Sequence, residues 1–377
     1  MSDTQDFALV IRDLLSRRFG PEKAATLLAA SPLLGYLVRK TKAANKGSKS
    51  RGSFANLYAI YVLVEDYLNK EYDVRGDYSR YDGAKFSALF TRQRQLPFGE
   101  KLQNHALNSR LNDEFYKFYP DVEARPILRD VETQRYWLNE SLFIVDGVNI
   151  CSAVIEIIDA YVEARRGSFS SFIAACRRIQ ELDDSMASEK VEFIASLLNP
   201  NTDARIFEIV SFAIMKTYYG DSTVWLGSTR EDVTEQPLTL YKTGRTNAND
   251  GGIDFVMRPL GRFFQVTETL DLKKYFLDID KVQKFPITFV IKTEMSVEEI
   301  GERLRQGARQ AFGVTRIVDS YMSAIEEVIN IPLLLELLDE SIKRGAFGDL
   351  IAEVIIQSRA EFNLDDDEEA MIRSLDA

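Results

Sequence analysis

The stretch from Asn247 to Thr269 constrains the fold more than any other part of the sequence. Two apolar segments flank Pro259-Leu260-Gly261, a turn signal that predicts a β-hairpin. Whether the loop has two or four residues, the pairing places Asp254 directly opposite Gln265. Because side chains alternate along a strand, these two share one face with Thr267. The other face is apolar, with Ile253, Phe255, Met257, Phe264 and Val266.

The same residues carry a family resemblance. Gly-Gly-Ile-Asp at 251–254, a short hairpin, and aromatic-aromatic-Gln-Val-Thr at 263–267 resemble the active-site hairpin of PD-(D/E)XK nucleases. The closest branch is the Mrr-type, in which Gln replaces the second acidic residue. The resemblance implies that Asp254 holds a divalent metal and that Gln265 takes the second acidic position. Thr267 stands where the family has a lysine that polarises the attacking water or the phosphate. The alternative is a plain hairpin in which Asp254, at its open end, only makes hydrogen bonds within the fold.

The segments around the hairpin predict a compact mixed core. A helix capped by Thr202 or Asp203 runs to about Tyr219, and a second helix is expected over 271–285. Strands are expected at 223–226, 238–242 and 287–292. The order is that of the αβββαβ core implied by the resemblance, which covers roughly 203–293.

Glu208 lies in the first of these helices, where 206–215 is otherwise apolar except for Ser211. A helix that is apolar nearly all round is buried, and a buried carboxylate needs a partner. The resemblance implies that Glu208 faces the metal site. The alternative is a surface pair with Arg205 or Lys216.

We therefore expect an α+β or α/β protein of three parts. Residues 1–200 form a helical DNA-recognition region, 201–295 the nuclease core, and 296–377 a C-terminal helical region with an acidic tail. Asn199-Pro200-Asn201 is the expected boundary. A capping box at Ser296 begins a helix to about Phe312. Its arginines either contact DNA or pair with neighbouring glutamates: Arg303, Arg305 and Arg309.

Charge is distributed unevenly along a chain of net −11. Residues 1–60 carry ten Lys/Arg and four acidic residues, whereas 361–377 carry one Arg and seven acidic residues. A phosphate backbone responds to the local patch, so the net charge does not exclude nucleic acid. Residues 39–53 hold six basic residues and no acid, and predict a flexible loop. Its basic side chains either contact phosphates or are merely solvated: Lys42, Lys46, Lys49 and Arg51.

Residues 80–140 are rich in Arg, Gln, Asn and aromatic residues. Arginine reads guanine in the major groove, and Asn or Gln reads adenine. Arg92, Arg94 and Arg135 are the candidate DNA contacts here, although an ordinary polar surface has the same composition.

Several classes of protein and site are disfavoured. No apolar run approaches 18 residues, and the N-terminus does not have the pattern of a signal peptide, so we expect a cytoplasmic protein of a bacterium or archaeon. Cys151 and Cys176 lie in apolar surroundings and are expected to be buried thiols. His105, the single histidine, argues against histidine-based chemistry. No GxxxxGK[ST] motif occurs, so no nucleotide cofactor is expected.

These features predict a site-specific double-stranded DNA endonuclease of the type II restriction kind. Asp254, Glu208 and Gln265 supply the oxygen ligands that Mg²⁺ prefers. With Thr267 at the lysine position, Lys242 is our candidate for the positive group and Arg245 the second. The resemblance implies a homodimer. One alternative is a DNA-binding protein with a degenerate, inactive core, and another is a helical interaction scaffold that binds no DNA.

Overall fold

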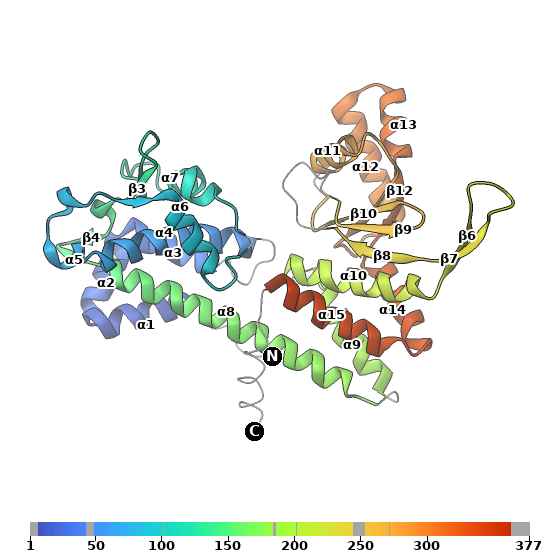
Figure 1. Cartoon of the computed structure of the whole chain (residues 1–377), viewed down its shortest axis with the longest axis horizontal. Coiled ribbons are helices and arrows are strands. Elements are labelled where there is room, and N and C mark those ends of the chain that lie inside the picture. The colour runs from blue at the N-terminus through green and yellow to red at the C-terminus, as the bar shows by residue number, and fades with distance from the viewer. Residues whose placement is uncertain are drawn as a thin grey trace. The chain divides into compact units, whose positions relative to one another are not determined.

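The computed structural model describes residues 7–42, 49–100, 102–183, 186–200, 202–243, 253–270 and 272–362 (Figure 1). The side chains of Lys42, 49–53, 272–273 and Phe362 lie outside this description. The chain forms two compact units. The first ends at Phe172, and the second extends from Ile173 to Glu361.

Helices dominate the first unit. Gly20, with φ of 84°, separates the first two of them, and Pro21 follows at the first helical position. The long helix α4 is buried along most of its length and forms the centre of the unit's core with Tyr36 and Phe115. The α-helices are α1 (Phe7–Phe19), α2 (Pro21–Ala30), α3 (Pro32–Lys42), α4 (Lys49–Asn69), α5 (Tyr72–Arg75), α6 (Phe86–Gln95), α7 (Leu111–Phe118) and the first part of α8 (Cys151–Gln180), which continues into the second unit. Short turns of other helix types lie at Tyr78–Arg80, Ala106–Arg110 and Glu140–Leu142.

The first unit also contains strands that the expected all-helical region lacks. An antiparallel sheet of order β1-β3-β2 is made by β1 (Ala84–Lys85), β3 (Arg135–Leu138) and β2 (Ile127–Asp130). A hairpin of β4 (Ile144–Val145) and β5 (Val148–Asn149) precedes α8, within the region 1–200 that was expected to be helical. Asp146 and Gly147 both have positive φ, the geometry of an Asp-Gly hairpin turn. This turn signal overrides the apolar helical periodicity around it.

The predicted αβββαβ order is confirmed in the second unit. Its elements are α10 (Ala204–Gly220), β8 (Thr239–Lys242), β9 (Phe255–Arg258), β10 (Arg262–Thr267), α11 (Leu272–Lys281) and β11 (Ile287–Ile291). The sheet has the order β12-β11-β10-β9-β8. The pairs β8–β9 and β9–β10 are antiparallel, whereas β10–β11 and β11–β12 run parallel.

Two strands of this unit are absent from the sequence-based prediction. Strand β12 (Ile325–Ile329) lies where amphipathic helix was expected, because pairing with β11 overrides the local pattern. Strand β7 (Thr234–Pro237) pairs with β6 (Thr223–Leu226) in a separate two-stranded ribbon. The predicted strand at 223–226 therefore exists but does not belong to the main sheet.

Helices cover both faces of the five-stranded sheet (Figure 1). On one face, Phe212 of α10 packs on Phe255 of β9, with ring centroids 5.1 Å apart. On the other face, Tyr275 of α11 packs on Phe289 of β11 at 4.6 Å. The remaining helices of the unit are α9 (Ala187–Leu198), α12 (Val297–Phe312), α13 (Thr315–Ser323), α14 (Ile331–Lys343) and α15 (Phe347–Phe362).

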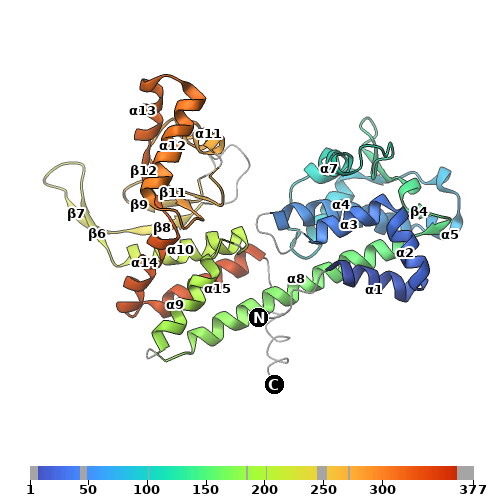
Figure 2. The same cartoon turned by 180° about the vertical axis from the view of Figure 1, so that it is seen from behind.

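The expected boundaries at 200 and 295 both fall inside the second unit. Helices α9 and α14 pack against α10, which joins segments before and after the predicted core into one body (Figure 2). Both ends of the expected flexible loop at 39–53 are helical, since α3 extends to Lys42 and α4 begins at Lys49. The rest of the expected loop, 43–48, lies outside the described residues. None of the helices in the described ranges combines the length and the apolarity needed to cross a bilayer.

Truncating Phe289 should unfold the second unit at markedly lower denaturant concentration. The side chain is 1% exposed and lies between the sheet and α11, so Phe289→Ala should cost roughly 3–5 kcal/mol. Phe285 is the matched control, because it is 47% exposed and contacts Phe263 at the edge of the same core. Phe285→Ala should cost less than about 1.5 kcal/mol. Urea unfolding followed by circular dichroism measures both, and equal losses would contradict this account of the core.

Candidate functional site

The hairpin pairs in the register that the sequence predicts, but Asp254 lies just outside the paired residues. Phe264 of β10 pairs with Phe255 of β9, and the ladder between the two strands ends at this pair. The backbone N–H of Asp254 donates to the carbonyl of Phe264 at 3.0 Å. The Asp254 carbonyl in turn accepts from the N–H of Thr243 at 2.9 Å, which ties it to the end of β8.

The Asp254 carboxylate is fixed at the mouth of the hairpin. Its Oδ2 accepts the backbone N–H of Val266 at 2.7 Å. In a continuing antiparallel ladder, a backbone carbonyl of the partner strand would take this donor. The side chain of Asp254 therefore replaces one rung of the ladder at the point where β9 begins.

Asp254 is held in a form that is easily protonated. Burial, together with the negative charge of Glu208, raises the pKa of Asp254 to about 7. The hydrogen bond from Val266 and the positive charges of Arg205 and Lys274 act in the opposite direction but do not cancel the shift. A carboxyl group with this pKa favours a cation beside it.

Glu208 of α10 lies between two cations. Its Oε2 is 2.6 Å from Nη1 of Arg205, and its Oε1 is 2.9 Å from Nζ of Lys242. Burial opposes ionisation, but Lys242 and Arg205 outweigh it and hold the pKa of Glu208 below its usual value. The pairing with Arg205 that the sequence left open is thus present, whereas Lys216 pairs instead with Glu353.

Lys242 reaches this cluster because of the sheet register. It pairs with Phe255 across β8 and β9, so both side chains face α10. The structure therefore brings three of the predicted residues together: Glu208, Lys242 and Asp254.

Gln265 has a side-chain oxygen without a hydrogen-bond partner among the described residues, whereas the hydroxyl of Thr267 is hydrogen-bonded. Gln265 is buried, its Nε2 donates to the carbonyl of Val266 at 3.3 Å, and its Oε1 has no hydrogen-bond partner among the described residues. An orphaned buried acceptor needs an explanation, such as an ion. Thr267 is also buried, but its hydroxyl donates to the carbonyl of Thr269 at 3.1 Å. Thr267 therefore does not substitute for the lysine expected at its position.

The donors at the hairpin mouth suit a hard divalent cation. Asp254 supplies a carboxylate and Gln265 a free amide oxygen, both of the type that Mg²⁺ prefers. Glu208 is the third predicted ligand, but two cations already neutralise it. In the described part of the chain, no three His, Cys, Asp or Glu side chains converge into a metal-binding group. The fit is therefore to a weak site with Asp254 and Gln265 as its principal ligands.

Sequence reasoning missed a second buried ion pair beside the site. Lys292 follows β11, and its side chain is 2% exposed. Its Nζ lies 3.1 Å from Oε1 of Glu268 and also donates to the carbonyl of Thr202. A charged residue at the end of an apolar strand was the available signal. This lysine joins the end of β11 to the residues just before α10.

The DNA-contact candidates of the first unit have partners within that unit. Arg92 makes two hydrogen bonds to Glu65, at 2.7 and 2.8 Å. Arg94 donates to the carbonyl of Glu100 at 2.6 Å. The remaining candidates lie outside the described side chains: Lys42, Lys46, Lys49, Arg51 and Arg245.

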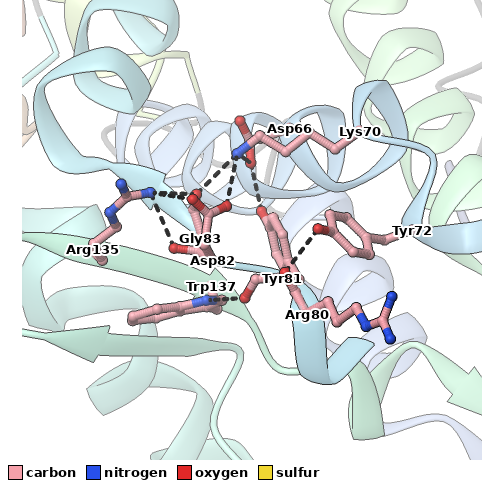
Figure 3. A network of polar contacts seen from close by, with 9 residues as sticks. All are labelled: Asp66, Lys70, Tyr72, Arg80, Tyr81, Asp82, Gly83, Arg135 and Trp137. Atoms are coloured by element: carbon pink, nitrogen blue, oxygen red, sulfur yellow. Dashed lines mark hydrogen bonds and ion pairs between the residues drawn. The ribbon is translucent and has the colours of Figure 1, made fainter. Parts of the chain in front are cut away.

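Arg135 belongs to a polar network that fixes the segment ahead of β1 (Figure 3). Its Nη1 is 3.0 Å from Oδ2 of Asp82 and 3.3 Å from the Gly83 carbonyl, which also accepts from Lys70. Trp137 donates its Nε1–H to the carbonyl of Tyr81 at 2.8 Å. A Cβ at Gly83 would lie 2.6 Å from the Trp137 ring, so the close packing requires glycine here. Arg135 thus has a structural role.

The burial of the two cysteines and the exposure of the single histidine are as the sequence predicts. Cys151 and Cys176 are both free and buried, and burial raises the pKa of each thiol. His105 is exposed.

No protein-family model, no curated protein and no solved structure matches the chain. The evidence for the chemistry of the site therefore lies in the site's own residues.

Replacing Asp254 by asparagine should stabilise the protein in a pH-dependent way. The folded-state pKa of about 7 lies above the unfolded value of about 3.9, so the folded protein retains a proton that the unfolded chain releases. Stability is therefore lost as the pH rises from about 4 to 7. In EDTA, Asp254→Asn should unfold with a free energy about 1–3 kcal/mol higher than wild type at pH 8, and the gain should vanish toward pH 4.

Asp232 provides a control of opposite sign. Hydrogen bonds from Thr229 lower its pKa, so Asp232→Asn should lose stability above pH 4 rather than gain it. A pH-independent effect of Asp254→Asn in urea titrations would contradict the raised pKa.

Proposed function

We propose that the protein is a Mg²⁺-dependent, site-specific double-stranded DNA endonuclease of the type II restriction kind. The observation that carries the proposal is the pair at the hairpin mouth. A carboxylate with a raised pKa lies where β9 begins, and the neighbouring strand β10 carries a buried amide oxygen that has no partner in the described chain. Hydrolysis of a phosphodiester needs oxygen ligands for a cation and positive charge for the phosphate. In this proposal Asp254 and Gln265 supply the ligands, and Lys242 supplies the charge.

Asp254 and Gln265 would hold the metal ion in this proposal. Bound Mg²⁺ lowers the pKa of a water ligand and neutralises charge that develops on the phosphate. The hydrogen bond from Val266 orients the Asp254 carboxylate before any ligand arrives. Because Gln265 is neutral, the site should bind Mg²⁺ more weakly than one built from two carboxylates.

Lys242 is the proposed source of positive charge in place of the missing motif lysine. Glu208 holds its ammonium group at 2.9 Å, at the end of β8, and the Asp254 backbone is bonded to the residue after it. Glu208 is therefore a positioning residue in this scheme. It orients Lys242 and, through its negative charge, raises the pKa of Asp254.

The proposal includes double-stranded DNA as substrate, a homodimer acting on a palindromic site, and a cytoplasmic restriction-modification role. The resemblance of residues 251–267 and the αβββαβ order support it.

A DNA-binding protein with an inactive nuclease core is the second candidate. The specific observation that favours it is Thr267, whose hydroxyl is used within the fold. This candidate binds DNA tightly and does not cut it with Mg²⁺.

Incubating the protein with unmethylated phage DNA tests the two candidates directly. We expect discrete fragments with Mg²⁺, none with EDTA, and none with Asp254→Ala. Binding of DNA without fragments under all conditions would favour the inactive candidate. Fragment ends would also give the recognition sequence.

Lys242→Ala should slow cleavage by about 10²–10³-fold, the usual cost of removing one group that stabilises transition-state charge. Lys216→Ala is the matched control, because Lys216 forms a similar ion pair, with Glu353 at 2.8 Å, away from the hairpin mouth. The control should cleave at nearly the wild-type rate. Wild-type cleavage by Lys242→Ala would remove Lys242 from the mechanism.

A further inference from the structure

The C-terminal half of α12 and the turn after it form a basic stretch that the proposed chemistry does not use. Residues 303–318 contain four arginines and no acidic residue in a chain of net charge −11. These are Arg303, Arg305, Arg309 and Arg316. A local excess of positive charge of this kind suits a polyanion.

An open hollow of about 440 Å³ lies beside this helix. It is lined by Leu270, Arg303, Gln306, Gly307 and Gln310. The α12 residues of this set recur at intervals of three, four and seven, so they form one stripe along the helix. The glycine removes a side chain from the centre of the stripe.

The two glutamines of the stripe are available for a ligand. Within the described ranges, the side chains of Gln306 and Gln310, and of Arg309 beside the stripe, have no hydrogen-bond or ion-pair partner. Arg303 pairs with Glu299 at 2.8 Å, but both side chains are about half exposed. Such a surface pair contributes little and is readily exchanged for another anion.

The hollow lies on the face of the sheet that carries Gln265. Gln265 pairs with Phe289, and Phe289 shares a hydrophobic cluster with Ile300 and Leu304 of α12. Leu270 follows the end of β10, the strand whose Val266 anchors Asp254. Helix α12 thus covers the face of the sheet that carries Gln265, opposite the face covered by α10 (Figure 1).

We infer that the α12 stripe lies in the major groove of DNA and reads an A·T base pair beside the cleaved phosphate. An α-helix fits this groove, a glutamine amide pairs with the N6 and N7 of adenine, and an apolar side chain contacts the methyl group of thymine. Gln306 and Gln310 supply the amides, Leu270 supplies the apolar contact, and Arg309 contacts the backbone phosphate. This inference rests on the proposed function, because it names part of that site's substrate.

The inference is tested by selecting bound sequences from a random library of DNA duplexes with the 377-residue chain. Asp254→Ala serves as the background, because it blocks cleavage while leaving α12 unchanged. Adding Gln306→Ala and Gln310→Ala should abolish one A·T preference and weaken binding to the selected sequence by about 5- to 100-fold. Binding to unrelated sequences should not change, since no charge is removed.

Arg309→Gln separates the phosphate contact from base reading. It should weaken binding to all sequences alike and reduce the slope of log affinity against log salt by about 1. Lys343→Gln is the matched control, because it removes one exposed positive charge from an i,i+4 pair on α14. The control should leave both the slope and the sequence preference unchanged.

The outcomes distinguish this inference from the proposed activity. If wild type cleaves DNA and the double glutamine variant keeps its specificity and affinity, only the α12 inference is overturned. If the A·T preference is lost on substitution but wild type never cleaves, base reading stands and the endonuclease activity fails. If the Asp254→Ala protein selects no sequence, the inference is overturned together with site-specific recognition.

Discussion

The packing of the second unit depends on the pairing of one buried carboxylate, Glu208. Glu208 lies in a helix that is apolar on nearly every side, and an unpaired charge there would cost several kcal/mol. Arg205 and Lys242 both pair with it, which fixes the end of β8 against α10. Because β9 pairs with β8, this contact also sets where the hairpin mouth lies. The position of Asp254 therefore depends on the ion pairs that Glu208 forms with Arg205 and Lys242.

The same charges shift the pKa values of Glu208 and Asp254 in different ways. Glu208 has cations on both oxygens and stays ionised, whereas Asp254 has one backbone N–H and a negative neighbour. Their pKa values consequently shift in opposite directions. Paired carboxyl groups with divergent pKa values are typical of sites that do chemistry, although structural ion-pair networks shift pKa values as well. The orphaned oxygen of Gln265 adds a feature that a purely structural ion pair does not require.

Local sequence was sufficient for the parts of the site that depend on strand register. The turn at 259–261 determines which residues of β9 and β10 face each other, so the pairing of Phe255 with Phe264 could be predicted directly. The capped start of α10 and the capping box at Ser296 were predictable for a similar reason, since each cap involves residues only two or three apart. Strand β12 was not predictable, because its pairing partner β11 is more than thirty residues away in the chain and its own pattern is also compatible with a helix.

The sequence by itself determined the hairpin, its register, the αβββαβ order and the need for a partner at Glu208. Each follows from short-range periodicity, turn chemistry or the cost of burying a charge. Only the tertiary structure decided that Lys242 and Arg205 are those partners, that Thr267 is used inside the fold, and that Lys292 forms a second buried pair. It also decided that α9 and α14 belong to the same unit as the sheet. These outcomes depend on which distant side chains meet, and that is set by packing rather than by spacing along the chain.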